Sequence, residues 1–274
     1  MTFWFDTHSH IQDPIFQEDF QEVLERAKNQ GVTRILLAAS GEEDARQACQ
    51  LALEHPMLYV ALGVHPHEAS SWDPETGDRL KTLTEEVNRQ ARESGRDPIV
   101  VAIGEIGLDF YYDFSPREIQ HQVFRTQLEL AHELDLPLVI HMREATAATL
   151  EALNLAHQDG LLSEDHPPGV IHCYSGSAET LPALLKLGFM IGFDGPITFK
   201  NAKKPLEALA AVPHDRLVLE TDAPWLTPTP YRGKRNEPSY LPIIGQKAAE
   251  ILGLSPEETA ALTTDNAKRL FRID

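Results

Sequence analysis

The feature of this sequence that most restricts its fold is a repeated unit, in which a short apolar run leads through a polar or glycine break into a longer amphipathic stretch. The runs are rich in β-branched residues and are continuous rather than alternating, which is typical of parallel strands covered on both faces. The eight runs are TFWFDTHSH, RILLAAS, LYVALGVHP, PIVVAIGEIGLDF, PLVIHMR, GVIHCYSG, FMIGFDG and RLVLETDAP.

The amphipathic stretches between the runs carry helix start signals. Ser115 and Glu118 stand three apart at the beginning of the stretch 115–135, and Ser255 and Glu258 repeat this spacing. A serine followed three residues later by a glutamate predicts a capping box, so we expect a helix to begin at each of these serines.

Eight strand-and-helix units in 274 residues predict a (β/α)8 TIM barrel of the α/β class. The strand ends recur about every 31 residues between His8 and Asp222, which is the length of a βα unit. A doubly wound open sheet is the main alternative, but it gives no reason for polar residues at nearly every strand end. No linker of low complexity interrupts the chain, so we expect residues 1–274 to form a single domain.

Composition limits the classes of function. The net charge of −18, from 24 basic and 42 acidic residues, argues against a broad grip on nucleic acid, although a local basic pocket for one strand end stays compatible with it. No apolar run is long enough to span a bilayer, and no signal peptide is evident, so no membrane role is expected. The two cysteines, Cys49 and Cys173, fit a reducing cytoplasm, and neither is assigned as a ligand.

Metal-capable side chains end most of the predicted strands, where a barrel carries its chemistry. His8 and His10 are two residues apart, so both point to the same side of their strand. An HxH triplet alone is weak evidence, because His65 and His67 form a second one. A metal site is therefore predicted only from the full set of strand-end residues, which comprises His8, His10, His65, Glu105, His141, His172 and Asp222.

All of these except His65 form a candidate ligand set, which is larger than a single tetrahedral zinc requires. The set suits two metals bridged by one carboxylate, and Glu105 lies in the middle of the order. For a single histidine a buried hydrogen-bonded role is the ordinary alternative, and for Asp222 a helix cap. A carboxylate at Glu105 is rarely buried unless it is paired or binds a metal. Imidazole with carboxylate favours zinc or manganese, whereas magnesium prefers oxygen ligands.

At these positions the sequence resembles the TatD family of metal-dependent deoxyribonucleases, within the amidohydrolase-like TIM barrels. The resemblance implies that Glu105 with His8, His10 and Asp222 holds one metal and that Glu105 with His141 and His172 holds the other. It also implies magnesium or another exchangeable divalent ion as the cofactor. The motifs that carry it lie in the family's order between residues 6 and 240 and are DTHSH, GVHPH, GEIGLDF, VIHMR, IHCYSG, LVLETDAPWL and PYRGKRNEPSY.

The function that this resemblance implies is a 3′–5′ deoxyribonuclease that acts on a single strand or a 3′ end, with no obligate protein partner. Water activated by the metals would attack the phosphodiester, with Asp222 and Glu105 as the catalytic carboxylates and Asp222 as the acceptor of the water's proton. Asp109 and Glu220 are candidates for orienting the ligands. Two alternatives stay open, namely an ester or amide hydrolase such as an aminoacyl-tRNA deacylase, and a non-catalytic metal-stabilised barrel.

Candidate substrate contacts lie in basic loops after the seventh and eighth runs, which read FKNAKK and YRGKRNEP. Barrels often bind phosphate in these loops, and an arginine fork matches phosphate oxygens, so we expect Arg232 and Arg235 to contact phosphate. His65 resembles the family's active-site histidine and is expected to touch the scissile phosphate. Arg143, two residues beyond His141, is expected to meet a phosphate or a ligand carboxylate.

Overall fold

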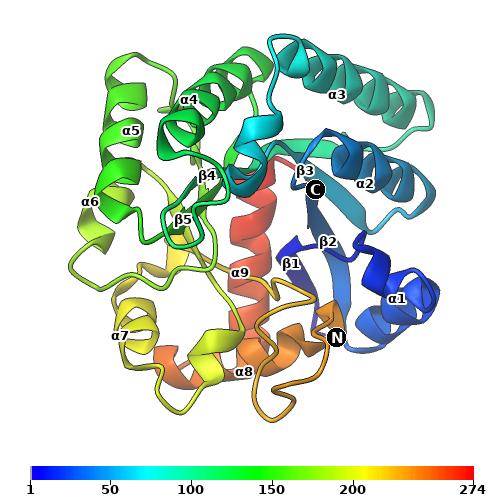
Figure 1. Ribbon diagram of the computed structural model, residues 1–274. Helices are drawn as coiled ribbons and strands as arrows, with labels where there is room; N and C mark the ends of the chain where they lie inside the picture. Colours follow the sequence, from blue (N-terminus) through cyan, green and yellow to red (C-terminus); the bar gives the residue numbers. More distant parts are fainter. Residues whose placement is uncertain (1) are drawn as a thin grey trace.

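Figure 1 shows a computed structural model of the chain, which describes residues 2–274. Eight strands form one parallel sheet in the order β1-β2-β3-β4-β5-β6-β7-β8, with helices arranged around it. The strands are β1 (Trp4–Ser9), β2 (Val32–Ala38), β3 (Leu58–Leu62), β4 (Val100–Asp109), β5 (Leu138–Arg143), β6 (Gly169–Ile171), β7 (Met190–Phe193) and β8 (Leu217–Leu219). The helices are α1 (Phe20–Asn29), α2 (Glu42–Glu54), α3 (Thr76–Glu93), α4 (Arg117–Leu134), α5 (Thr146–Gln158), α6 (Leu181–Lys186), α7 (Lys203–Ala211), α8 (Leu241–Leu252) and α9 (Pro256–Phe271).

The sheet closes by joining its first strand to its last. Ser9 and Ala223 form a parallel bridge just beyond β8. The backbone N–H of His10 donates to the carbonyl oxygen of Ala223 at 2.7 Å, and that of Asp222 donates to the carbonyl oxygen of His8 at 2.9 Å. The predicted (β/α)8 barrel is therefore confirmed, and the carboxyl ends of β1 and β8 lie side by side.

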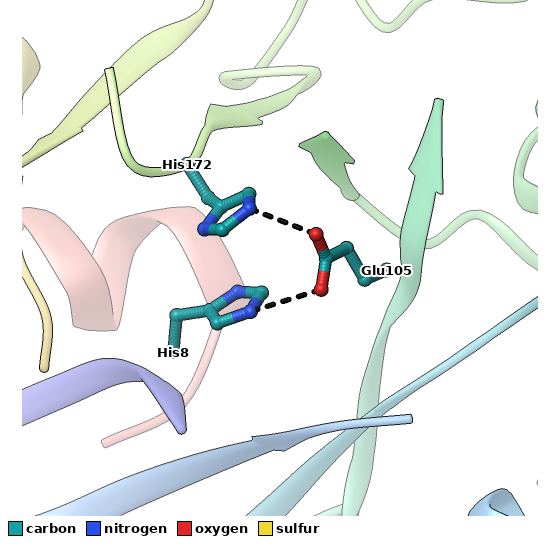
Figure 2. A group of neighbouring side chains, drawn as sticks. All are labelled: His8, Glu105 and His172. Atoms are coloured by element: carbon teal, nitrogen blue, oxygen red, sulfur yellow. Dashed lines mark ion pairs between the residues drawn. The ribbon is translucent and has the colours of Figure 1, made fainter. Parts of the chain in front are cut away.

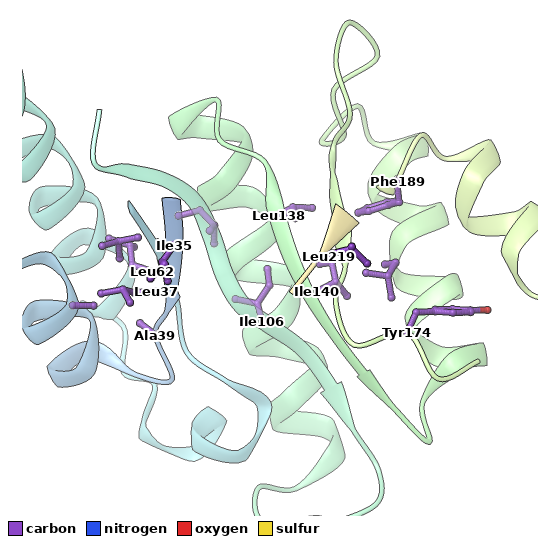
Figure 3. Close-up of a cluster of buried hydrophobic side chains, with 14 of the residues drawn as sticks. Ile35, Leu37, Ala39, Leu62, Ile106, Leu138, Ile140, Tyr174, Phe189 and Leu219 are labelled. Carbon is purple, nitrogen blue, oxygen red and sulfur yellow. The ribbon is translucent and has the colours of Figure 1, made fainter. Parts of the chain in front are cut away.

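Apolar side chains fill two layers, because successive residues of a strand point to opposite faces. The outer layer lies between strands and helices and includes Ile35, Leu138 and Ile140 (Figure 3). The alternate residues, such as Leu36 and Val139, belong to a separate cluster in the barrel interior. Both faces of the strands are thus apolar, which explains why the runs are continuous in the sequence.

The C-terminal helix α9 closes the amino end of the barrel. The Phe271 ring lies 5.7 Å from the ring of Phe5 and belongs to the interior cluster. At the start of α9, the Ser255 hydroxyl accepts from the Glu258 N–H while the Glu258 carboxylate accepts from the Ser255 N–H. The capping box predicted there is confirmed.

The cap predicted at Ser115 is wrong. Helix α4 begins at Arg117, and no side chain caps it. The Ser115 hydroxyl instead accepts from the Ser70 N–H at 3.0 Å and donates to the carbonyl oxygen of His67 at 2.8 Å. A contact with the short 3-10 helix η2 (Pro66–Ser71) has therefore replaced the local cap.

No helix within residues 2–274 is both long and apolar enough to cross a membrane.

Phe271→Ala is expected to lower the free energy of unfolding by roughly 3–5 kcal/mol, because it leaves a cavity where α9 closes the barrel. Phe3→Ala is the matched control, since the Phe3 side chain lies at the same end but is 52% exposed, whereas Phe271 is 2% exposed. Its effect should stay within about 0.5 kcal/mol. Denaturant unfolding followed by circular dichroism measures both, and equal losses would contradict the role given to α9.

Candidate metal centre

Glu105 lies at the centre of the barrel mouth with its two carboxylate oxygens facing different histidines. Oε2 lies 3.2 Å from Nε2 of His8, and Oε1 lies 2.8 Å from Nε2 of His172, as Figure 2 shows. The two imidazole rings are stacked with their centroids 3.9 Å apart. Glu105 thus stands between β1 and the end of β6.

The other histidines of the mouth divide between the same two oxygens. Nε2 of His10 lies 3.5 Å from Oε2 of Glu105, whereas Nδ1 of His141 and Nε2 of His65 lie 2.6 and 3.4 Å from Oε1. The two oxygens of Glu105 therefore face two different groups of imidazoles. The structure therefore places His65 in the donor group of His141, although the sequence indicated only a substrate contact.

His8, His10 and Asp222 form the donor group on the other side of Glu105. The Nε2 atoms of His8 and His10 are 3.0 Å apart and lie 3.8 and 3.6 Å from Oδ1 of Asp222. All three side chains are largely buried, and imidazole and carboxylate are ligands that bind divalent transition metals well. The donor set therefore fits a divalent cation at the place where closure joins β1 to β8.

Irregular pairing of two strands aims these side chains at the mouth. Between residues 6 and 9, β1 advances three residues while β2 advances two, and β4 does the same against β5 between residues 103 and 106. His8 and Glu105 lie inside these two insertions. An extra residue in one strand turns the following side chains toward the other face, so the regular two-residue alternation does not hold at the ligands.

Two further carboxylates lie behind the histidines. Oδ2 of Asp109 lies 2.7 Å from Nε2 of His67 and 3.3 Å from Nε2 of His141. Oε1 of Glu220 lies 3.6 Å from Nδ1 of His172. The Asp109 contact is of the kind that orients an imidazole ring. The Glu220 oxygen accepts from the backbone N–H of Cys173 at 2.5 Å and makes no hydrogen bond with His172, so its orienting role stays a prediction.

The two carboxylates that face the histidines stay ionised. Burial alone would raise the pKa of Glu105, but the charges of His172, His65 and His8 hold it well below its usual range. Burial also opposes ionisation of Asp222, and the hydrogen bond with His10 keeps its pKa below the ordinary value. Both groups therefore carry the negative charge that binding of a cation requires.

A third cluster at the mouth was not found from the sequence. The Cys173 thiol and the carboxylates of Asp194 and Asp222 offer ligand atoms within 4.8 Å of one another. Oδ2 of Asp194 is buried and has no hydrogen-bond partner within residues 2–274, and burial beside Asp222 and Glu220 raises the pKa of Asp194 well above its usual range. Asp194 directly follows the apolar run of β7, so the signal used for the other strand ends was present there too.

The three arginines proposed as substrate contacts differ in their surroundings. The Arg232 guanidinium lies 3.7 Å from the Phe199 ring centroid. The Arg143 side chain is exposed, with its guanidinium 4.5 Å from the Tyr111 ring centroid. Arg235 donates to both carboxylate oxygens of Asp19, at 2.8 and 2.6 Å. Contact of these three side chains with phosphate stays a prediction, and Arg235 would have to share its charge with Asp19.

A parallel barrel whose strand ends bring imidazoles and carboxylates together is the architecture of a metal-dependent hydrolase. The sequence matches the family described as TatD related DNase over residues 5–272, and the chain belongs to that family. The resemblance predicted from the motifs is therefore confirmed, and the chain is a hydrolase of the kind that acts on ester bonds.

Three relatives cover almost the whole chain. An uncharacterized metal-dependent hydrolase, YabD of Bacillus subtilis, is 42% identical over 270 residues, which are 98% of this chain and 99% of that protein. The 3′-5′ ssDNA/RNA exonuclease TatD of Erwinia tasmaniensis is 38% identical over 275 residues, covering 98% of this chain and 100% of that protein. The crystal structure of YjjV, a TatD homologue of Escherichia coli, superimposes with a TM-score of 0.88 at 31% identity, covering 99% of this chain and 98% of that one.

Gly107→Ala is expected to destabilise the chain because the backbone φ is +143° and an added Cβ would lie 2.0 Å from the carbonyl oxygen of His141. The matched control is Gly95→Ala, where φ is +72° but nothing lies within 4 Å. The backbone penalty should be about 1–2 kcal/mol at Gly95, in the left-handed region, and roughly 1–3 kcal/mol at Gly107, where φ is open almost only to glycine. Crowding should add roughly 1–3 kcal/mol at Gly107 alone. Urea unfolding that gives the same loss for both variants would show that close approach to His141 is unimportant.

Proposed function

We propose that this hydrolase removes nucleotides from the 3′ end of single-stranded DNA with two divalent cations. The observation that carries the proposal is the division of the Glu105 oxygens between two groups of histidines. Magnesium, manganese and zinc are the candidate ions. A free 3′ end as substrate, action without a protein partner and a cytoplasmic location are parts of the proposal.

Two sets of residues would hold the cations, with Glu105 shared between them. His8, His10 and Asp222 would complete the first set. His141 and His172, with Nδ1 and Nε2 3.4 Å apart, would complete the second, beside which His65 also lies. Two cations in such a site lower the pKa of bound water and stabilise negative charge on phosphate oxygens.

The protein's own part in the reaction is to hold protons and orient groups. Asp222 is ionised and reaches the mouth, so its carboxylate is placed to accept the proton of the attacking water. Glu105 faces both donor groups, with Oε2 toward His8 and Oε1 toward His172. Asp109 orients the ring of His141 from behind, and the Glu220 carboxylate lies behind His172 with its Oε1 3.6 Å from Nδ1.

The choice of a nucleic-acid end is supported by relatives and by burial. The Erwinia tasmaniensis relative is named a 3′-5′ exonuclease of single-stranded DNA and RNA and is 38% identical over its whole length. The donor side chains around Glu105 are largely buried. The end of a single strand can reach such a buried site more easily than the middle of a duplex can. We place Arg143, Arg232 and Arg235 as phosphate contacts at the rim, because arginine forks match phosphate oxygens.

A 5′-labelled single-stranded DNA oligomer incubated with the protein and magnesium or manganese is expected to give a ladder that shortens from the 3′ end. Glu105→Ala should slow the reaction by at least about 100-fold, because it removes the side chain shared by both donor groups. The matched control is Glu257→Ala, an exposed carboxylate at the opposite end of the barrel. A sequencing gel reads the result, and a chelator should abolish the ladder.

An oligomer that stays intact while metal is demonstrably bound to the protein would contradict the exonuclease proposal. Turnover of small esters or amides under the same conditions would then favour that class of substrate. Absence of turnover on every class would favour the non-catalytic barrel.

Asp109→Asn is expected to weaken metal binding by roughly 10–100-fold, because it removes the charge that orients His141. Isothermal titration of metal-depleted protein with manganese or zinc measures the affinity. Asp113→Asn serves as the control, since Asp113 lies in the same loop but pairs with the exposed Arg117. Equal affinities for the Asp109 variant and the wild type would show that His141 needs no carboxylate behind it.

A further inference from the structure

Exposed aromatic side chains are concentrated at the mouth of the barrel. Within residues 2–274 five aromatic side chains are exposed, and Phe3 alone of these lies at the opposite end. The others follow β4 and β8 and are Tyr111 (60% exposed), Tyr112 (45%), Phe114 (66%) and Trp225 (51%). Contiguous apolar surface of this kind marks a binding site more often than it serves the fold.

The rings after β4 are packed against one another in a definite arrangement. Tyr112 and Phe114 are stacked, with centroids 5.3 Å apart and planes at 8°. Tyr111 stands at 89° to Tyr112, and the Arg143 guanidinium lies 4.5 and 4.6 Å from the centroids of these two tyrosines. The four side chains form one surface, which we name the aromatic platform.

The platform is tied directly to the metal centre by Asp109. Its Oδ1 accepts from the backbone N–H groups of Tyr111 and Tyr112 at 2.8 and 3.0 Å, while its Oδ2 faces Nε2 of His141 at 3.3 Å. The Phe114 ring also meets the His67 ring edge-on at 4.9 Å. The aromatic platform therefore has a fixed position beside the second donor group.

Trp225 occupies the corresponding place beside the first donor group. Its ring meets the His10 ring edge-on at 5.0 Å, and its backbone N–H donates to the carbonyl oxygen of Asp222 at 2.9 Å. Exposed aromatic surface thus borders the centre on both sides, next to the residues that would hold the cations.

We propose that the aromatic platform and Trp225 hold the unpaired bases of a single strand by stacking, and so place its backbone over the metal centre. Stacking of a base on an aromatic ring is worth roughly 1–3 kcal/mol, and it tolerates any sequence because every base has a π-face. It also suits a chain of net charge −18, which cannot rely on a broad basic surface. This inference rests on the proposed function, since it names the part of the substrate that the same site grips.

Stacking of bases on these rings would give the enzyme a preference for single-stranded substrates. Bases in a duplex are already paired and stacked on one another, so a duplex cannot use the platform until its end frays. The preference for a single strand therefore comes from the bases, and the sequence of those bases matters little. Removal of the bases alone, with every phosphate retained, should remove this part of the affinity.

The test measures binding of a 5′-fluorescent oligothymidylate to the metal-loaded protein by anisotropy, with phosphorothioate linkages at the 3′ end to block cleavage. A second oligomer has the same backbone but abasic residues near that end. The wild type should bind the abasic oligomer roughly 10-fold or more weakly. Phe114→Ala and Trp225→Ala should each weaken binding of the oligothymidylate about 5-fold or more and leave the abasic affinity unchanged. Phe3→Ala should alter neither affinity.

Equal binding of the two oligomers by the wild type, or an equal loss on both oligomers in the variants, would overturn the stacking proposal. Cleavage of an unprotected oligomer by the same preparation keeps this outcome separate from the proposed function. Cleavage without dependence of affinity on bases means that stacking is wrong and the exonuclease stands. Base-dependent binding without cleavage supports the platform and contradicts the exonuclease.

Discussion

The mouth of this barrel depends on one buried carboxylate that remains charged. An ionised carboxylate in a protein interior is costly unless charges and hydrogen bonds compensate it. Glu105 is compensated by imidazoles from several strands, and His8 and His172 contact separate oxygens. The closure of β1 onto β8, the uneven pairing of β4 with β5 and the close backbone approach at Gly107 all serve to bring those partners within reach.

The amino end of the barrel contributes mainly to stability, and the carboxyl end carries the candidate metal centre. At the amino end, Phe5 and Phe271 belong to an apolar cluster that fills the interior and is closed by α9. At the carboxyl end, polar side chains replace that packing, and Oδ2 of Asp194 is buried without a hydrogen-bond partner within the described residues. A concentration of buried polar groups weakens the mouth, so the apolar end must supply the surplus of stability that keeps the ligands in place.

The sequence predicted what depends on local periodicity and missed what depends on contacts between distant segments. The strands followed from continuous apolar runs, although β4 continues past Glu105, which was expected at its end, as far as Asp109. The cap at Ser255 needed only its own helix. The cap at Ser115 failed because a neighbouring loop offered its hydroxyl other partners. Arg235 reads as a free loop charge in the sequence, yet Asp19, which pairs with it, lies 216 residues away. The extra residues of β1 and β4 near His8 and Glu105 could not be predicted, because they do not change the run of apolar residues in the sequence.

Asp109 connects the candidate metal centre with the aromatic platform proposed to bind the substrate. One of its oxygens faces the ring nitrogens of His67 and His141, and the other holds the backbone of the loop that presents Tyr111 and Tyr112. Because the same carboxylate contacts both His141 and the loop of Tyr111 and Tyr112, it fixes the distance between the proposed metal ligand and a base stacked on that loop. Positioning a reacting bond accurately is worth more to the rate than tighter binding, because binding that is equal in the ground and transition states does not raise kcat. The acidic surface of the chain is compatible with this arrangement, since the bases are held by rings and only the few phosphates near the centre need positive charge.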